Sequence, residues 1–156
     1  MAVANHAYTC AKRKFDGSAA LEKFEPDARL TRNATLVANL GLCQLRLVDD
    51  SRWTWLTLIP QRPDISEIFE LTPLDQTMLT FETNLVASAL KSVTRCTKIN
   101  VAAIGNIVRQ LHVHVLARNE GDANWPGPIW GFGEAVPYEQ EARKHLADTI
   151  LKALSS

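Results

Sequence analysis

The chain has 156 residues, of which 46% are hydrophobic and 22% are charged, and its 17 basic residues balance its 17 acidic residues. A chain of this length buries about 70% of its unfolded surface as one domain, so we expect a single domain over residues 1–156. The even charge balance and the lack of a long basic run argue against a nucleic-acid partner. No run approaches the ~18 apolar residues of a membrane span, so we expect no membrane partner either.

The cysteines and the first residues bear on localisation. Cys10, Cys43 and Cys96 are odd in number, widely spaced and without a C-x-x-C pair, which is typical of reduced thiols in a cytosolic protein. The segment before Cys10 lacks the apolar core of a signal peptide. We therefore expect a cytoplasmic protein in which Cys43 and Cys96 fill small core positions.

The first half of the chain predicts an N-terminal extension, 1–30, followed by strands. Apolar and β-branched residues at 36–40, 43–48 and 53–59 predict three strands, with a turn at 49–51 that makes the last two antiparallel. Thr72-Pro73 is typical of a helix start, and apolar residues then recur at three- and four-residue spacing. This spacing predicts a long amphipathic helix that ends near Arg95.

The second half predicts a strand over 99–104, closed by Gly105-Asn106, and a further strand from Ile107 or Val108 to Ala117. Residues 118–133 contain six glycines and prolines together with Trp125 and Trp130, so we expect a long ordered loop. A helix is predicted over 138–154. Antiparallel strands around one long helix indicate the α+β class.

The strand before this loop reads Gln110-Leu111-His112-Val113-His114-Val115-Leu116. Because side chains alternate along a strand, the apolar residues are expected to face a core and Gln110, His112 and His114 to form a polar row about 7 Å apart. Three interpretations are open: a solvent-facing strand surface, a metal site, or a catalytic pair working near pH 7. A metal site needs further ligands, and only His6 and His145 remain as histidines.

The surroundings of this row resemble the histidine-triad (HIT) family. Its signature is His-φ-His-φ-His-φ-φ, where φ is apolar, after a turn of glycine and a polar residue; residues 105–118 match it, with Gln110 at the first triad position. The order of the predicted elements and the run 125–128 also fit, so the similarity covers about 36–131. The resemblance implies a HIT-like α+β fold: a mainly antiparallel sheet, a long helix packed on it and a C-terminal helix.

The resemblance also implies an activity. A nucleotidyl hydrolase or transferase of this type cleaves at the α-phosphate of a nucleoside phosphate derivative. His112 matches the nucleophile that forms a nucleotidyl-histidine intermediate. His114 matches the residue that contacts the phosphate and leaving-group side and can help with proton transfer. Gln110 is expected to orient His112 through its main-chain carbonyl. No cofactor and no metal are expected; the expected partners are a small-molecule nucleotide and a second copy of the chain, paired through the long helix and a sheet edge.

This chain departs from the family pattern at Gln110 and at Trp55, where the family carries histidines, so the side-chain proton relay is lost. Further candidates for substrate binding by resemblance are Asp49 toward the ribose, Asn100 toward the phosphate, and Gly105 with Asn106 as donors to phosphoryl oxygens. Asp49 and Asn106 are equally compatible with plain turns. The alternatives to an enzyme are a non-catalytic nucleotide-binding module and, less favoured, a metal-binding protein using His112 and His114.

Overall fold

The computed structural model describes residues 24–155. It contains five strands, three α-helices and one 3-10 turn, in the order α1 (Ala28–Thr31), β1 (Ala34–Asn39), β2 (Cys43–Val48), β3 (Thr54–Pro60), η1 (Ile68–Glu70), α2 (Pro73–Thr94), β4 (Lys98–Ala102), β5 (Val113–Arg118) and α3 (Gln140–Leu154). The strands form one sheet in the order β1-β2-β3-β5-β4, and every neighbouring pair is antiparallel. The α+β class is therefore confirmed.

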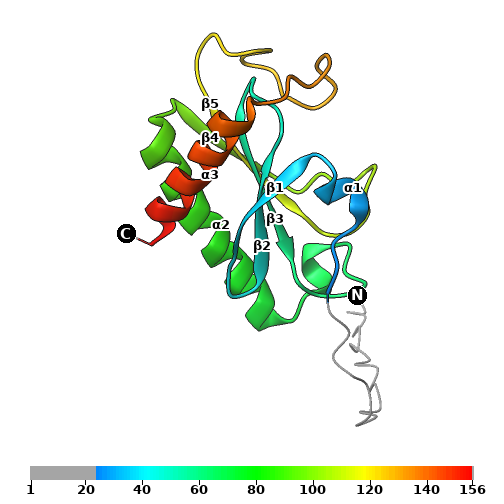
Figure 1. The fold of residues 1–156 in the computed structure, drawn as a ribbon. Helices are drawn as coiled ribbons and strands as arrows, with labels where there is room; N and C mark the ends of the chain where they lie inside the picture. The colour runs from blue at the N-terminus through cyan, green and yellow to red at the C-terminus, as the bar shows by residue number, and fades with distance from the viewer. Residues whose placement is uncertain (1–23, 156) are drawn as a thin grey trace, which may run out of the picture.

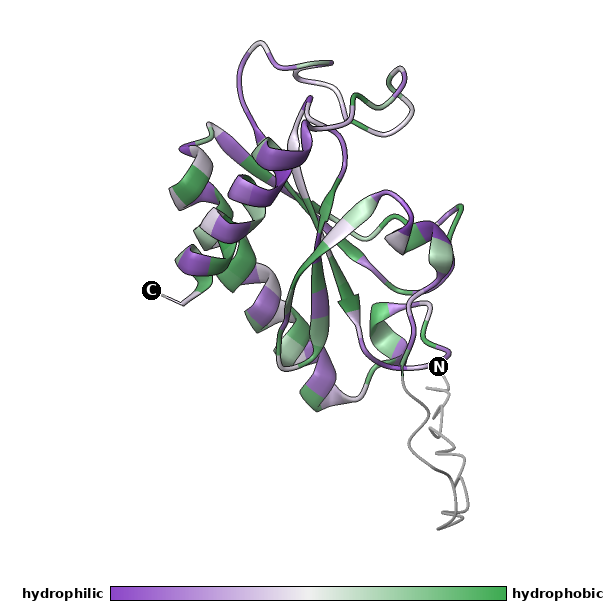
Figure 2. Ribbon diagram, in the orientation of Figure 1, coloured by the Kyte–Doolittle hydropathy of each residue, from purple (hydrophilic) through white to green (hydrophobic). Residues whose placement is uncertain are grey.

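The sheet has a helix layer on one side only. Figure 1 shows α2 and α3 lying together against the sheet, with α1 on the opposite side and the loop between β5 and α3 at one end. Figure 2 shows that the strands are mostly hydrophobic, whereas the outer turns of α3 are hydrophilic. Among the helices of residues 24–155, none combines the length and apolar character that a bilayer crossing requires.

Strand β5 supplies side chains to both faces of this sheet. Val113, Val115 and Ala117 lie in the main core between the sheet and the helices, as alternation along a strand requires. Leu116 lies in a second, smaller cluster on the other face. All six residues of β5 are buried, so the strand is covered on both sides.

The long helix α2 begins and ends where the sequence predicts. Thr72 accepts a hydrogen bond from the Asp75 main-chain N–H, Pro73 occupies the first turn, and Arg95 ends the helix in a left-handed conformation at φ 52°. Its buried face carries residues at helical spacing, including Leu79, Val86 and Leu90. The burial of Cys43 and Cys96 as free thiols confirms their core positions; Cys10 lies outside the described residues.

The predicted start of the histidine-bearing strand is wrong. The strand begins at Val113 rather than at Ile107 or Val108, and β4 ends at Ala102 rather than at 104. Continued pairing with β3 would place Pro60 opposite Leu111, and proline has no N–H to donate. The main-chain N–H of Leu111 instead donates to the carbonyl of Ile65, at 2.8 Å. Residues 103–112 therefore form an irregular segment beside the sheet.

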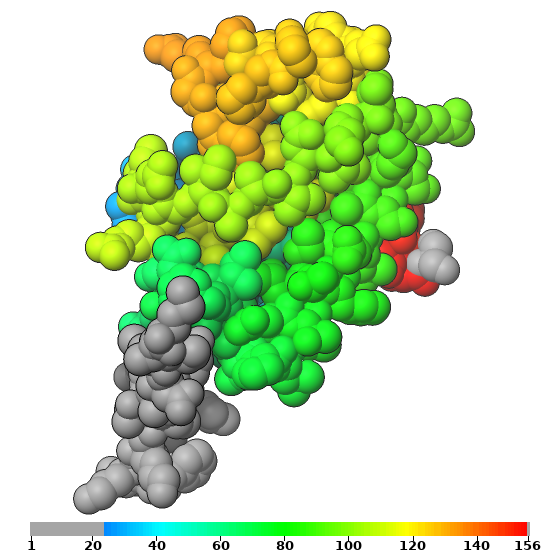
Figure 3. All heavy atoms as spheres, turned by 180° about the vertical axis from the view of Figure 1, so that it is seen from behind, coloured from blue at the N-terminus to red at the C-terminus, as the bar shows by residue number. Residues whose placement is uncertain are grey.

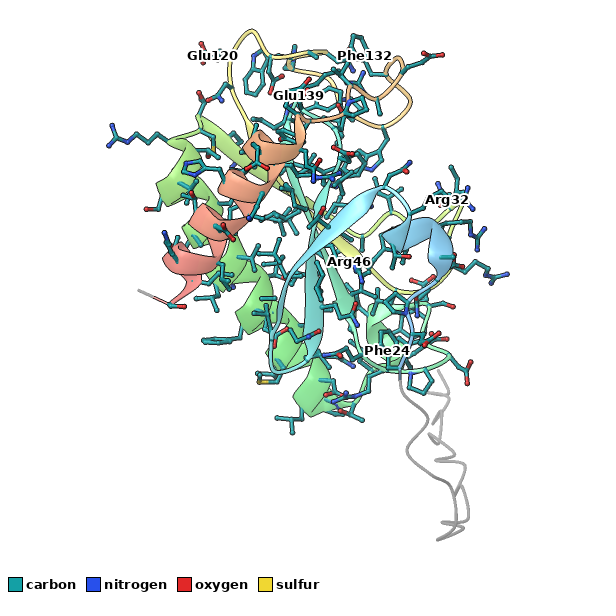
Figure 4. The ribbon with its side chains drawn as sticks, viewed as in Figure 1. Phe24, Arg32, Arg46, Glu120, Phe132 and Glu139 are labelled. Atoms are coloured by element: carbon teal, nitrogen blue, oxygen red, sulfur yellow. The ribbon has the colours of Figure 1, made fainter. Side chains whose placement is uncertain are left out.

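The loop after β5 is held in place by Arg118, whose side chain is buried. Its guanidinium makes a two-point ion pair with Asp122, with both N–O distances 2.8 Å, and donates to the carbonyl of Gly127 at 3.0 Å. The guanidinium also lies 5.6 Å from the ring centre of Trp125. Figure 4 shows that the later part of this loop, with Phe132, lies at the same end of the sheet as the start of α3. The loop thus folds back over the second face of the sheet.

We predict that Arg118→Met lowers the free energy of unfolding by about 3–5 kcal/mol, because the Asp122 carboxylate, which is only 13% exposed, loses its buried partner. Urea denaturation followed by circular dichroism measures this change. The matched control is Arg29→Met, which breaks the exposed Arg29–Asp27 pair and is expected to cost less than about 1 kcal/mol. Equal losses in the two variants would contradict the prediction.

Candidate functional site

The ring of His112 is held immediately before β5, where it is only 5% exposed. Its Nδ1 lies 2.7 Å from the main-chain carbonyl oxygen of Gln110. A carbonyl only accepts hydrogen bonds, so Nδ1 carries the proton of the neutral ring and Nε2 keeps its lone pair. The geometry gives His112 a nucleophilic nitrogen in a fixed tautomer.

The ring of His114 is held by the side chain of Trp55 on the neighbouring strand. The indole Nε1–H of Trp55 donates to Nδ1 of His114 at 3.0 Å. An indole only donates, so Nδ1 accepts and the neutral ring carries its proton on Nε2. Burial, together with the charge of His112, lowers the pKa of His114 to about 4, although a hydrogen bond with the main chain of Ile104 acts in the opposite direction. His114 is therefore neutral at pH 7.

Aromatic side chains pack around this pair of histidines. The centres of the two imidazole rings are 4.7 Å apart in an edge-to-face arrangement. Trp130, from the loop after β5, places its ring centre 5.4 Å from that of His114 and 6.4 Å from that of Trp55. The loop thereby closes the His114 side of the site with a tryptophan.

A pocket of about 350 Å³ opens beside His112. It is formed by the irregular segment 103–112 on one side and by the residues before η1 on the other. Its lining residues are Ser66, Glu67, Ala103, Gly105, Asn106, Arg109, Gln110, Leu111 and His112. Four of the residues singled out from the sequence therefore meet around one cavity, with His112 among them.

Gly105 is needed for the tight fold of this segment. A Cβ atom at this position would lie 2.9 Å from the main-chain oxygen of Val108 and 3.8 Å from Cε1 of His112. Any other residue would therefore push the segment outward and change the wall of the pocket next to His112.

The side chain of Gln110 has a role that the sequence did not predict. Its Oε1 accepts a hydrogen bond of 2.7 Å from the main-chain N–H of Asp27. Nearby, the Arg29 guanidinium donates to the carbonyl of Ile107 at 3.1 Å. The end of the N-terminal extension thus packs against the segment that leads to His112. Gln110 and His112 both precede β5, so of the expected row of three side chains on one strand only His114 lies on the strand itself.

The remaining two candidates lie away from the pocket lining. The Asp49 carboxylate accepts from the main-chain N–H of Tyr138 at 2.9 Å and from the Arg143 guanidinium at 2.6 Å, which ties β2 to α3. Asn100 lies opposite Leu116 in the β4–β5 pairing, and so on the same face of the sheet as His114. Their contacts with ribose and phosphate stay predictions.

The described residues offer His112 and His114 little help in binding a metal. Within residues 24–155, no group of three or more His, Cys, Asp and Glu side chains is placed to hold an ion. His145 is exposed on α3, in the helix layer, and His6 lies outside the described residues. The Nδ1 atoms of both rings are already engaged by Gln110 and Trp55. The other nitrogen of His114 is engaged by the main chain of Ile104, so of these two rings only His112 keeps a free nitrogen, its Nε2.

Comparison with known proteins agrees with this geometry. The model of the HIT domain family matches residues 29–121. The structure is similar to that of a histidine triad (HIT) protein of Sinorhizobium meliloti 1021, with 61% sequence identity and a TM-score of 0.82 over 83% of this chain and 96% of that one. It is also similar to a histidine triad protein of Bradyrhizobium japonicum, with 35% identity and a TM-score of 0.83 over 85% of this chain and 98% of that one.

A histidine triad protein of Marinobacter aquaeolei VT8 is similar as well, with 34% identity and a TM-score of 0.82 over 85% of this chain and 97% of that one. A search of curated proteins found no match. The chain therefore belongs to the HIT domain family, whose members bind nucleotides or act on them as hydrolases or transferases.

Proposed function

We propose that this protein is a nucleotidyl hydrolase or transferase that uses His112 as its nucleophile. The observation that carries this proposal is the 2.7 Å hydrogen bond between Nδ1 of His112 and the carbonyl of Gln110. It leaves the lone pair of Nε2 free on a ring that lines the 350 Å³ pocket. A neutral imidazole in a fixed tautomer is the group that nucleophilic attack on phosphorus requires.

The reaction proceeds in two displacements. Nε2 of His112 attacks the α-phosphorus, the bond to the leaving group breaks, and a nucleotidyl-histidine forms. The ring then carries a positive charge, which the carbonyl of Gln110 stabilises through the Nδ1–H. Water or another acceptor attacks the phosphorus, and the electron pair of the P–N bond returns to Nε2. Dividing one displacement into two easier ones is the logic of covalent catalysis.

Donors near Gly105 and Asn106 suit the charged phosphoryl oxygens. Both residues line the pocket with His112, and fixed donors aimed at developing negative charge are a large source of transition-state stabilisation. We assign to the groups near Gly105 and Asn106 the binding of the α-phosphate. The Nε2–H of His114 is engaged by the main chain of Ile104, so His114 borders the site without donating to the phosphate.

A second candidate function is a nucleotide-binding module without turnover. It is favoured by the engagement of the Gln110 side chain with Asp27, which makes this side chain part of the scaffold rather than a proton carrier. Binding of AMP without release of product from any nucleotide derivative would support this alternative.

We also propose a homodimer that pairs through α2 and the β4 edge. Strand β4 is at the edge of the sheet, and an unpaired edge offers its main-chain groups to another strand. Both elements carry exposed apolar side chains, with Phe81 on α2 at 61% exposure and Val101 on β4 at 50%. Figure 3 shows α2 and the segment that follows it on one continuous face.

For the nucleophile, we predict that wild type incubated with a nucleotide substrate and quenched in base carries a nucleotidyl group on His112, and that His112→Ala carries none. Intact-protein and peptide mass spectrometry detect the adduct. His145→Ala is the matched control, because this exposed histidine lies on α3, and it is expected to keep the adduct. Unchanged turnover in His112→Ala would contradict the proposal.

For His114, we predict a loss of stability at mildly acidic pH. Its pKa is about 4 in the folded protein against an ordinary value of 6.5. Between pH 4 and pH 6.5 this side chain is therefore protonated in the unfolded chain but not in the folded protein. The free energy of unfolding therefore falls as the pH drops from 6.5 to about 4, by on the order of 3 kcal/mol.

Urea titrations at several pH values measure this loss. His114→Gln is the control, since its amide oxygen can still accept the Trp55 N–H while the side chain no longer titrates. The variant is expected to show a flatter dependence over the same range. The same slope in both proteins would assign the effect to other groups.

For the dimer, we predict that Val101→Lys shifts the protein to a monomer, because it places a charge in the apolar part of the interface. Size-exclusion chromatography with light scattering measures the mass. Leu151→Lys on α3, where the side chain is 43% exposed, is the control and is expected to keep the mass of wild type. A monomeric wild type at micromolar concentration would contradict the proposal.

A further inference from the structure

We propose that the substrate of this site is an anhydride of a nucleoside 5′-phosphate, whose leaving group departs as a phosphate or carboxylate anion, and that nucleoside phosphoramidates are poor substrates. This inference rests on the proposed function of His112. It follows from the hydrogen bonds around the two histidines, which leave the leaving group without a histidine able to protonate it.

The first step distinguishes the two substrate classes. In both, the lone pair of His112 Nε2 forms the bond to the α-phosphorus. In an anhydride, the P–O bond breaks and its electron pair leaves on an oxygen as a stable anion, so no proton is required. In a phosphoramidate, the P–N bond breaks, and the nitrogen must gain a proton as it leaves because an amine anion is too basic to depart. The second class therefore needs a general acid in the pocket.

His112 cannot be that acid. Its one proton lies on Nδ1 and is held by the carbonyl of Gln110 at 2.7 Å, on the side of the ring away from the attacking nitrogen. That proton stabilises the positive charge that forms on the ring during attack.

His114 does not supply a transferable proton either. Its surroundings are Trp55 and Thr57 on β3, the Ile104 main chain, the ring of His112 and the ring of Trp130. None of these is an acidic group that would favour the charged ring. The indole N–H of Trp55 already donates a hydrogen bond to the lone pair of His114 Nδ1, which is where a second proton would have to bind. His114 thus remains a neutral hydrogen-bond donor, consistent with its pKa of about 4.

Gln110 and Trp55 complete the argument, because they occupy two positions where the family pattern has histidines. An amide and an indole donate hydrogen bonds but have no proton to give up near neutral pH. The Oε1 of Gln110 is fixed by the N–H of Asp27, so only its Nε2 donors remain for a ligand. These donors suit the oxygens of an anionic leaving group.

Two charged side chains, Glu67 and Arg109, also line the pocket. Both residues are exposed. Arg109 favours an anionic leaving group, whereas Glu67 is the one carboxylate among the lining residues and so the one alternative source of a proton. The test must therefore include Glu67.

The experiment compares two substrates of the same nucleoside, a dinucleoside polyphosphate and a nucleoside 5′-phosphoramidate, at pH 7. General acid catalysis contributes about 10²–10⁴-fold in enzymes, so we expect kcat/KM for the anhydride to exceed that for the phosphoramidate by at least about 100-fold. Mass spectrometry of the nucleotidyl-His112 adduct with each substrate is the second readout.

The outcomes separate this inference from the function on which it rests. Adduct formation with both substrates at similar kcat/KM overturns the inference and keeps the nucleophile. No adduct and no turnover with either substrate overturns both. Rapid phosphoramidate turnover that Glu67→Gln abolishes overturns the inference in favour of Glu67 as the acid.

Two variants of Gln110 test whether the missing proton donor is due to this position. Gln110→His introduces a titratable ring and is expected to raise phosphoramidate turnover relative to anhydride turnover by at least about 10-fold. Gln110→Asn also alters the contact with Asp27 but adds no titratable group, and it is expected to keep the wild-type ratio. Thermal unfolding confirms that both variants fold. An unchanged ratio in Gln110→His overturns the assignment of the missing proton donor to this position.

Discussion

The burial of β5 on both faces is the constraint from which the site follows. One face of this strand packs Val113 and Val115 against the helix layer, and the other carries His114 under the loop that contains Trp130. A polar ring in such a place must find partners for its nitrogens within the protein, because burial without them costs free energy. Trp55 meets this need for His114, and the carbonyl of Gln110 meets it for His112. The contacts that make burial tolerable are the same ones that set the tautomers.

The same constraint explains Arg118, the last residue of β5. Its alternation places it on the face of His114, where a cation buried at the strand end needs an anion as its partner. The anion is the Asp122 carboxylate of the protein itself. By joining the strand end to Asp122 and Gly127, Arg118 fixes the loop that brings Trp130 to the histidines. A cation at the end of a buried strand therefore acts on the site through the loop rather than by touching a ligand.

The sequence predicted the parts of this structure that depend on local patterns. The caps of α2 at Thr72 and Arg95 and the two-residue alternation of β5 are of this kind, since each rests on neighbours within a few positions. The start of β5 was mispredicted because the main chain of Leu111 bonds to Ile65, a contact between segments that no periodicity records. The ion-pair partner of Asp49 could not be predicted for the same reason, because Arg143 is 94 positions further along the chain.

Gln110 shows why a residue type at a motif position does not by itself define a role. At this position the main-chain carbonyl orients the ring of His112, and any residue provides it. The side chain is free to take another task, and here it accepts the N–H of Asp27, so that the end of the N-terminal extension forms part of the surroundings of the pocket. Trp55 on β3 is a similar case. Its indole N–H donates a hydrogen bond that orients His114, but unlike a histidine at this position it cannot titrate. Both positions thus keep the geometry of the site while giving up its proton carriers. The attack by His112 depends on geometry alone, whereas the protonation of a basic leaving group does not.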